Sequence, residues 1–180
     1  MYEFLENYLL FITFSIFFGT ILNDYRLGYT IIYFVFFLFL AYFVHWTIHK
    51  THIPFFTDVH DKHHTAHEKD EIINIILEVF IELFSTGGFL MLLNIPFLTK
   101  SLIIYYPLLY STIHFINYKL DNKHHREHHR DITVNYGPSI IDHLFGTKYN
   151  NEYENMNYDV INCLLLFIGL YILKHRNNIW

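Results

Sequence analysis

Histidines are concentrated in two short stretches of this chain, and their spacing repeats. Eleven of the fourteen histidines lie within residues 45–67 and 124–129. The first stretch holds an HxxxH and an HxxHH pattern and the second repeats HxxHH, and together these comprise His45, His49, His60, His63, His64, His125, His128 and His129. Residues three and four apart share one face of a helix, so each pattern would cluster its imidazoles. Neutral imidazole is the commonest metal ligand, and eight are more than one zinc ion needs. The spacing therefore predicts a metal centre with two ions.

The composition indicates a membrane protein. Of the 180 residues, 53% are apolar, 20% aromatic and only 16% charged, whereas about a quarter of the residues in a soluble domain are charged. Four apolar segments, at residues 4–22, 29–44, 79–98 and 101–118, approach the roughly 20 residues that a transmembrane helix needs. Glu3 and Glu6 stand where a signal peptide would be basic, so the first segment is expected to be a retained helix.

The topology follows from the need for both histidine stretches to meet at one site. Residues 70–120 must then cross the membrane an even number of times, which predicts a helical hairpin that turns near residues 94–96. Ten lysines and arginines would lie on the histidine side, and only Arg26 and Lys100 on the other. Because Lys and Arg accumulate in cytoplasmic loops, the histidine face and the N-terminus are predicted to be cytoplasmic. The apolar stretch 160–173 is short for a span and is expected to be a buried or interfacial helix on that same side.

The predicted fold class is thus an all-α, multi-pass membrane protein with about four transmembrane helices, arranged as two hairpins around a cytoplasmic, histidine-lined di-metal site. Residues 1–180 would form a single membrane-embedded domain whose core spans residues 45–147. The net charge of −5 and the lack of a long basic run argue against a nucleic-acid partner. Cys163 is the only cysteine, which excludes an internal disulfide and a Cys-rich metal site.

An all-histidine ligand shell favours oxidation chemistry on a lipid. Soluble di-iron bundles use Glu-x-x-His motifs, and none occurs in this sequence. Ligands at the membrane boundary would let an acyl or sterol chain reach the metal from the bilayer, while electrons arrive from the aqueous side. Two iron ions are expected, because zinc has no redox chemistry to offer. Zinc could still replace iron by mismetallation.

The order of these motifs resembles a known family. HWTIH at 45–49, HDKHH at 60–64 and HREHH at 125–129 are similar to the histidine boxes of the fatty acid hydroxylase/sterol desaturase superfamily. NYG at 135–137 and DHLFGT at 142–147 resemble the tail that follows its last box. The resemblance implies a membrane di-iron oxidoreductase that hydroxylates or desaturates a fatty acyl, sterol or related lipid with dioxygen. It also implies an external electron donor such as cytochrome b5 or a reductase, and a location in the endoplasmic reticulum membrane in a eukaryotic cell.

The chain departs from the family pattern at two positions. Ile141 stands where the family usually has tryptophan, and Tyr118 stands where some members complete a further HxxxH pair with His114. His114 is therefore a candidate ninth ligand. Histidines outside the boxes are expected not to be ligands, namely His52, His67, His124 and His175.

Several polar residues beside the boxes have open roles. Glu78 and Glu82 lie one helical turn apart near a membrane boundary, where they could be functional or merely interfacial. Asp142 could orient a ligand histidine or cap the following turn, and His143 could support a ligand or make a simple polar contact. Asn135 is expected to be a turn residue.

Two other functions fit parts of the sequence. A histidine-rich membrane metal-ion transporter is the main alternative, although a transporter should carry its ligands near the middle of its spans. Residues 124–128 also match the H-x-x-E-H pattern of some zinc proteases, but this leaves the first two boxes unexplained.

Overall fold

The computed structural model describes residues 2–65, 72–120, 122–149 and 157–177, and these segments contain helices but no strand. The helical class predicted from the sequence is confirmed. In chain order the elements are α1 (Tyr2–Leu22), α2 (Leu27–Lys50), α3 (Phe56–Thr65), α4 (Ile72–Ser85), the 3-10 helix η1 (Gly88–Leu92), α5 (Lys100–Lys119), α6 (Lys123–Arg130), α7 (Ser139–Phe145) and α8 (Asn157–Asn177).

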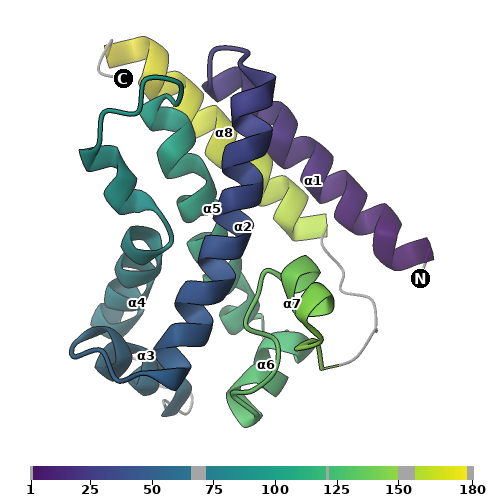
Figure 1. Ribbon diagram of the computed structural model, residues 1–180, viewed down its shortest axis with the longest axis vertical. Helices are drawn as coiled ribbons and strands as arrows, with labels where there is room; N and C mark the ends of the chain where they lie inside the picture. Colours follow the sequence, from purple (N-terminus) through teal and green to yellow (C-terminus); the bar gives the residue numbers. More distant parts are fainter. Residues whose placement is uncertain (1, 66–71, 121, 150–156, 178–180) are drawn as a thin grey trace.

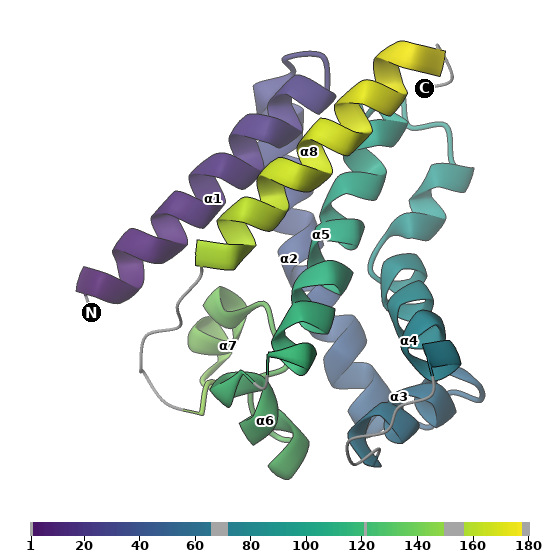
Figure 2. The same cartoon turned by 180° about the vertical axis from the view of Figure 1, so that it is seen from behind.

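The long helices run up and down along one direction, and the short ones gather at one end. Helices α1, α2, α5 and α8 lie side by side, with α1 and α8 running in one direction and α2 and α5 in the other, while α4 covers the other flank of α5 (Figures 1 and 2). Helices α3, α6 and α7 lie together at the lower end of both views. We call this lower end the histidine end, because α2 and α5 reach it with their histidine-bearing C-terminal turns.

Hydrogen bonds tie together the opposite end of the bundle. The Thr99 hydroxyl donates to the carbonyl of Leu22, and the Thr99 N–H donates to Asn23 Oδ1. The Lys174 ammonium donates to the same Leu22 carbonyl at 2.8 Å and pairs with Asp24 at 2.5 Å. The α1–α2 turn, the start of α5 and the end of α8 therefore meet there.

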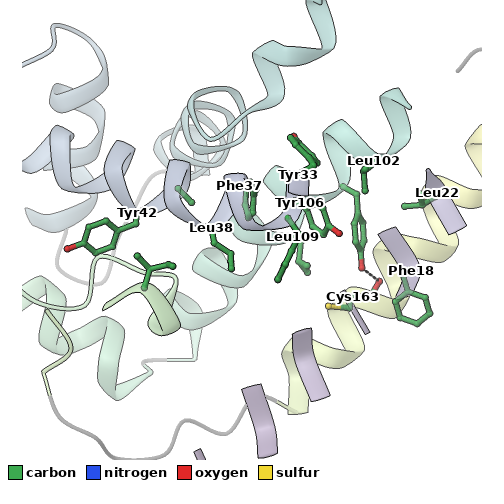
Figure 3. Packing of buried hydrophobic residues seen from close by; sticks show 14 of the residues in the cluster. Phe18, Leu22, Tyr33, Phe37, Leu38, Tyr42, Leu102, Tyr106, Leu109 and Cys163 are labelled. Carbon is green, nitrogen blue, oxygen red and sulfur yellow. Dashed lines mark hydrogen bonds between the residues drawn. The ribbon is translucent and has the colours of Figure 1, made fainter. Parts of the chain in front are cut away.

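Aromatic side chains fill the interior where α1, α2, α5 and α8 meet (Figure 3). Tyr33 also resolves a local problem in α5. Pro107 has no N–H, so the carbonyl of Ile103 lacks its usual helical donor. The Tyr33 hydroxyl donates to that carbonyl at 3.0 Å, and the buried helix keeps its hydrogen bonding complete.

Predicted and observed apolar segments differ in the third span. Helix α4 starts at Ile72 and stops at Ser85, so residues 79–98 do not form one continuous helix. Gly87 adopts φ +134°, a conformation that side chains disfavour, and it separates α4 from η1. The reversal between Leu92 and Lys100 lies where the sequence predicts a turn.

The prediction for residues 160–173 is right about the helix but wrong about its extent. They belong to the 21-residue helix α8, which packs on α1 and α5 and ends at Lys174 beside the α1–α2 turn. By length and composition, two helices of the described chain are apolar enough to cross a membrane, at Leu27–Lys50 and Tyr158–Arg176, and Tyr8–Leu22 is a shorter apolar helix. The sequence pattern underestimated the length of α8 because the apolar run stops before the polar turns that complete the helix.

This placement of α8 changes the charge balance between the two ends. Lys174 and Arg176 lie opposite the histidines, with Arg26 and Lys100, rather than beside them. Lys69 lies outside the described residues. The histidine end keeps the larger set, which is Lys50, Lys62, Lys119, Lys123, Arg126, Arg130 and Lys148. The excess of lysine and arginine at the histidine end is therefore smaller than the sequence predicts, but it remains on that end.

Candidate metal centre

Nine histidines from four helices converge at the histidine end of the bundle. The last turns of α2 carry His45 and His49, and α5 carries His114. Helix α3 supplies His60, His63 and His64. Helix α6 supplies His125, His128 and His129, and it starts where the Asn122 side chain accepts hydrogen bonds from the N–H groups of residues 124 and 125.

Five of these imidazoles form a first histidine group. Their ring nitrogens all lie within 4.8 Å of one another, and the members are His45, His49, His60, His64 and His128. The Nε2 atoms of His45, His49 and His128 are 3.1–3.2 Å apart. His60 Nε2 lies 3.0 Å from His49 Nε2 and 3.1 Å from His64 Nε2.

The remaining four imidazoles form a second histidine group beside the first. His63, His114 and His125 bring one ring nitrogen each within 4.8 Å of the others. His129 Nε2 lies 3.2 Å from His63 Nε2 and completes the group. The two groups touch where the rings of His64 and His129 stack with centroids 4.2 Å apart.

Helix geometry divides each HxxHH box between the two groups. Residues four apart share a face, whereas neighbours point about 100° apart. In α3 the outer pair His60 and His64 enters the first group and His63 the second. In α6 the division is reversed, because His128 enters the first group and His125 the second. Each of these short helices therefore contributes to both groups.

Hydrogen bonds at Nδ1 leave each Nε2 atom unprotonated, with its lone pair available to a metal ion. His45 Nδ1 donates to the carbonyl of Tyr136 and His128 Nδ1 to that of Val134, both at 2.6 Å. A carbonyl can only accept, so the proton of each neutral ring sits on Nδ1. The Nε2 atoms of His45 and His128 are nonetheless 3.1 Å apart. Two lone pairs at that distance repel each other unless a cation lies between them.

Two buried carboxylates of α4 hold further rings in the same tautomer. Glu78 Oε1 accepts from His60 Nδ1 at 2.7 Å, and Glu82 Oε1 accepts from His114 Nδ1. Both glutamates are less than 10% exposed. Their sequence positions left an interfacial role open, whereas the structure places them against the histidines. The i, i+4 spacing of two acids in an apolar helix was the available signal.

Burial keeps the imidazoles of α3 and α6 neutral. It lowers the pKa of His60 to about 4 and that of His128 to about 2, and neighbouring imidazoles act in the same direction. The pKa values of His63, His64 and His125 are also lowered, first by burial. At neutral pH these rings are uncharged, which is the form that binds metal.

The donor set fits metal ions. A metal–imidazole bond of about 2.1 Å with ligands at right angles places neighbouring nitrogens about 3.0 Å apart. The observed separations of 3.0–3.2 Å in the first group match this. In the second group, His114 Nε2 and His125 Nε2 are buried without a hydrogen-bond partner. Ligand histidines usually donate their other ring N–H to a carbonyl or carboxylate, as four of these do.

Comparison with known proteins agrees with the motifs. The family model described as fatty acid hydroxylase matches residues 30–147, which is more than half of the chain. This chain belongs to the fatty acid hydroxylase family. The match is consistent with the wider fatty acid hydroxylase/sterol desaturase superfamily, and the family implies an oxidoreductase that acts on a lipid. Searches of curated proteins and of solved structures gave no match.

The family's tail motif forms the loop that receives the histidine N–H groups. The carboxylate of Asp142, on α7, accepts from the N–H groups of Tyr136 at 2.9 Å and Gly137 at 2.7 Å, and from the Thr147 hydroxyl at 2.8 Å. It thereby holds the peptide whose carbonyl receives His45. Asn135 takes φ +52° and bonds to the backbone of His124 and Tyr149, as expected of a turn residue.

The two departures from the family pattern occupy defined places. The Tyr118 ring lies against the second histidine group, with its centroid 4.7 Å from that of His63. Ile141 is 4% exposed and belongs to the hydrophobic core. Neither departure removes a member of the two histidine groups.

Histidines outside the boxes lie outside both groups. His52 and His175 are exposed, and the His175 ring packs on Tyr171. His124 is buried but belongs to neither group, so the H-x-x-E-H pattern at 124–128 does not gather its two histidines at one site. His143 is exposed on α7, and His67 lies outside the described residues.

A largely apolar cavity of about 140 Å³ with an open mouth adjoins the histidines. His45, His114 and His125 form part of its wall. Its apolar wall comes from α1, α2 and α5 and includes Phe11, Ile12, Phe34, Phe37, Leu38 and Leu109. Phe34 lies eleven positions before His45 in α2, or about 16 Å along the helix. Asn117, His124 and Asn135 line the cavity near the histidines.

Proposed function

We propose that this protein is a membrane-bound di-iron oxidoreductase that hydroxylates or desaturates a fatty acyl, sterol or related lipid with dioxygen. The observation that carries the proposal is the close approach of histidine Nε2 lone pairs beside an apolar cavity. The first histidine group would hold one ion and the second the other, so that the ligands are His45, His49, His60, His63, His64, His125, His128, His129 and His114. Residues 1–180 would act as one domain.

Iron, when bound, would supply the activation of dioxygen that oxidation of an unactivated C–H bond requires. The chain supplies the remaining functions. Its neutral imidazoles hold the ions without cancelling their charge. The carbonyls of residues 134 and 136 and the carboxylates of Glu78 and Glu82 keep the rings oriented. The aromatic wall of the cavity would exclude water from the reacting carbon.

The cavity supports a lipid substrate. Its apolar lining, its open mouth and its position beside the histidines suit a hydrocarbon group. The polar lining residues lie near the histidines and the apolar ones extend away from them along α2 and α1. A lipid would therefore place its polar end near the metal centre and its hydrocarbon along the helices.

The surface supports immersion in a bilayer. Large apolar side chains are exposed along α1, α2, α4 and α8, for example Leu9, Ile32, Phe80 and Leu165, each at least 59% exposed. Soluble proteins rarely expose such extended apolar surface. We propose that the histidine end faces the cytoplasm, where cytochrome b5 or a reductase would deliver electrons. In a eukaryotic cell the endoplasmic reticulum is the expected membrane.

Loss of single histidines tests the function. His63→Ala and His128→Ala each remove one member of a different group and should abolish lipid oxidation, because misplacing a reacting group by about 1 Å can cost a hundredfold in rate. His175→Ala, on the exposed end of α8, is the matched control and should keep the activity. The assay is lipidomics of cells that express each variant, scored for an added hydroxyl or double bond. Metal flux into vesicles without an oxygen-dependent lipid product would favour a transporter instead.

A further inference from the structure

Helix α4 brings two buried carboxylates to two different histidine groups. Glu78 and Glu82 lie one turn apart on the same face, and α4 packs against both α3 and α5. Glu78 contacts His60 on α3, and Glu82 contacts His114 on α5. The residues between and around them on α4 are apolar, so the two acids stand out in an otherwise hydrophobic helix.

Each carboxylate hydrogen-bonds to a ring of one group, Glu78 to His60 and Glu82 to His114, although Glu78, Glu82 and His114 also bring one ligand atom each within 4.8 Å of the others. His60 Nε2 lies 3.0 Å from His49 Nε2, within the first group. His114 shares the second group with His63 and His125. The Nδ1 atom of His114 is occupied by Glu82, so its Nε2 is the atom free for an ion. The glutamates are thus positioning residues that act through one imidazole each.

We propose that Glu78 controls the retention of the ion in the first histidine group and Glu82 that of the ion in the second. This inference rests on the proposed di-metal centre. Two divalent ions held by neutral imidazoles would bring four positive charges into a buried site, which is unfavourable without nearby anions. Both carboxylates lie within hydrogen-bond distance of the ligand shell, and each would offset part of the positive charge at its own site. Residues in this position typically affect metal affinity by about 10–100-fold.

Different substitutions separate orientation from charge. Glutamine keeps an oxygen that can accept the imidazole N–H but has no charge, whereas alanine removes both. Glu82→Ala should therefore weaken retention of one ion by about 10–100-fold, with Glu82→Gln in between. Ile76→Ala, on the exposed face of the same helix, is the matched control and should retain both ions.

The experiment uses the full-length protein in detergent, loaded anaerobically with Fe²⁺ and equilibrated with increasing EDTA. Iron per chain is then measured by mass spectrometry. We expect wild type to hold two ions, and Glu78→Ala and Glu82→Ala each to release one ion at lower EDTA. Combining Glu82→Ala with His114→Ala should add little, because both act on the same ring. Combining Glu82→Ala with Glu78→Ala should release both ions at lower EDTA than in wild type.

Three results would overturn the inference. These are unchanged release in both alanine variants, equal loss of both ions in either variant, or additive effects of Glu82→Ala and His114→Ala. Wild type that binds no iron would instead refute the di-metal centre itself. If an alanine variant does not fold, the glutamine variant tests the charge alone, because its hydrogen-bond acceptor is retained, and it should still release one ion at lower EDTA than wild type.

Discussion

Asp142 offers a test of how the tail loop supports the histidines. Its carboxylate accepts two backbone N–H groups and one hydroxyl, at 2.7–2.9 Å, from residues 136, 137 and 147. In Asp142→Asn one carboxylate oxygen becomes an NH2 group. If the remaining oxygen still accepts the hydrogen bonds from the Tyr136 N–H and the Thr147 hydroxyl, the new NH2 group faces the Gly137 N–H, so that two donors point at each other.

The cost follows from the burial of this group. A buried donor without a partner costs about 1–3 kcal/mol. Loss of the carboxylate charge adds little to this cost, because burial already disfavours the ionised form of Asp142. Burial raises the pKa of Asp142 to about 6, against the opposing effect of its hydrogen-bond donors and Lys148. We therefore expect Asp142→Asn to lower the free energy of unfolding by about 1–3 kcal/mol at pH 7.

The pH dependence has a definite sign. The folded-state pKa of Asp142, about 6, lies above its ordinary value of 3.8, so between those values the folded protein binds a proton that the unfolded chain does not. This group therefore stabilises the fold as the pH falls through 6, by about 1.4 kcal/mol per unit at most. Asparagine does not titrate, so the stability difference between wild type and Asp142→Asn should widen from pH 7 to pH 5.

The assay is thermal unfolding of metal-free protein in detergent at pH 5 and pH 7, followed by iron retention at pH 7. Movement of the Tyr136 carbonyl should release the His45 ring, so the variant should also retain iron in the first histidine group less well. Asp131→Asn is the matched control, because that exposed carboxylate makes similar bonds to Thr133 without contacting the histidines. Wild-type unfolding and wild-type iron retention in Asp142→Asn would refute this reasoning.

Two further predictions concern the cavity and the membrane topology. Leu38→Trp should fill the cavity next to α2 and lower lipid turnover about tenfold by misplacing the substrate, with iron content unchanged; Ile32→Trp, on the exposed face of α2, is the control. An effect on iron rather than on lipid turnover would contradict the cavity's assignment. Because α8 ends opposite the histidines, tags at the N-terminus and near Lys123 should be accessible from one side and a tag after Trp180 from the other, as measured in selectively permeabilised cells. Equal accessibility of all three tags would argue against a membrane-crossing α8.

The sequence by itself determined the helical class, the family and the histidines that meet. These depend on local patterns. Spacings of three and four place imidazoles on one helix face, and long apolar runs indicate helices that lie in a membrane. The residues of the boxes and the tail loop are close in the chain, so their order was informative without a structure. His114 was also a candidate from local spacing, because some family members carry a second histidine four residues later, where this chain has Tyr118.

The tertiary structure decided how those residues are grouped and supported. Neighbours such as His63 and His64 join different groups because they point about 100° apart, and only the contacts that the α3 histidines make with rings on α2, α5 and α6 show what each one meets. The partners of the rings lie far away in sequence, as with Glu82 and His114, and no local pattern connects them. Helix α8 was misjudged for a related reason. The helix includes polar turns at both ends, which a search for apolar runs leaves out. It also packs against α1, and those contacts form only when the chain folds.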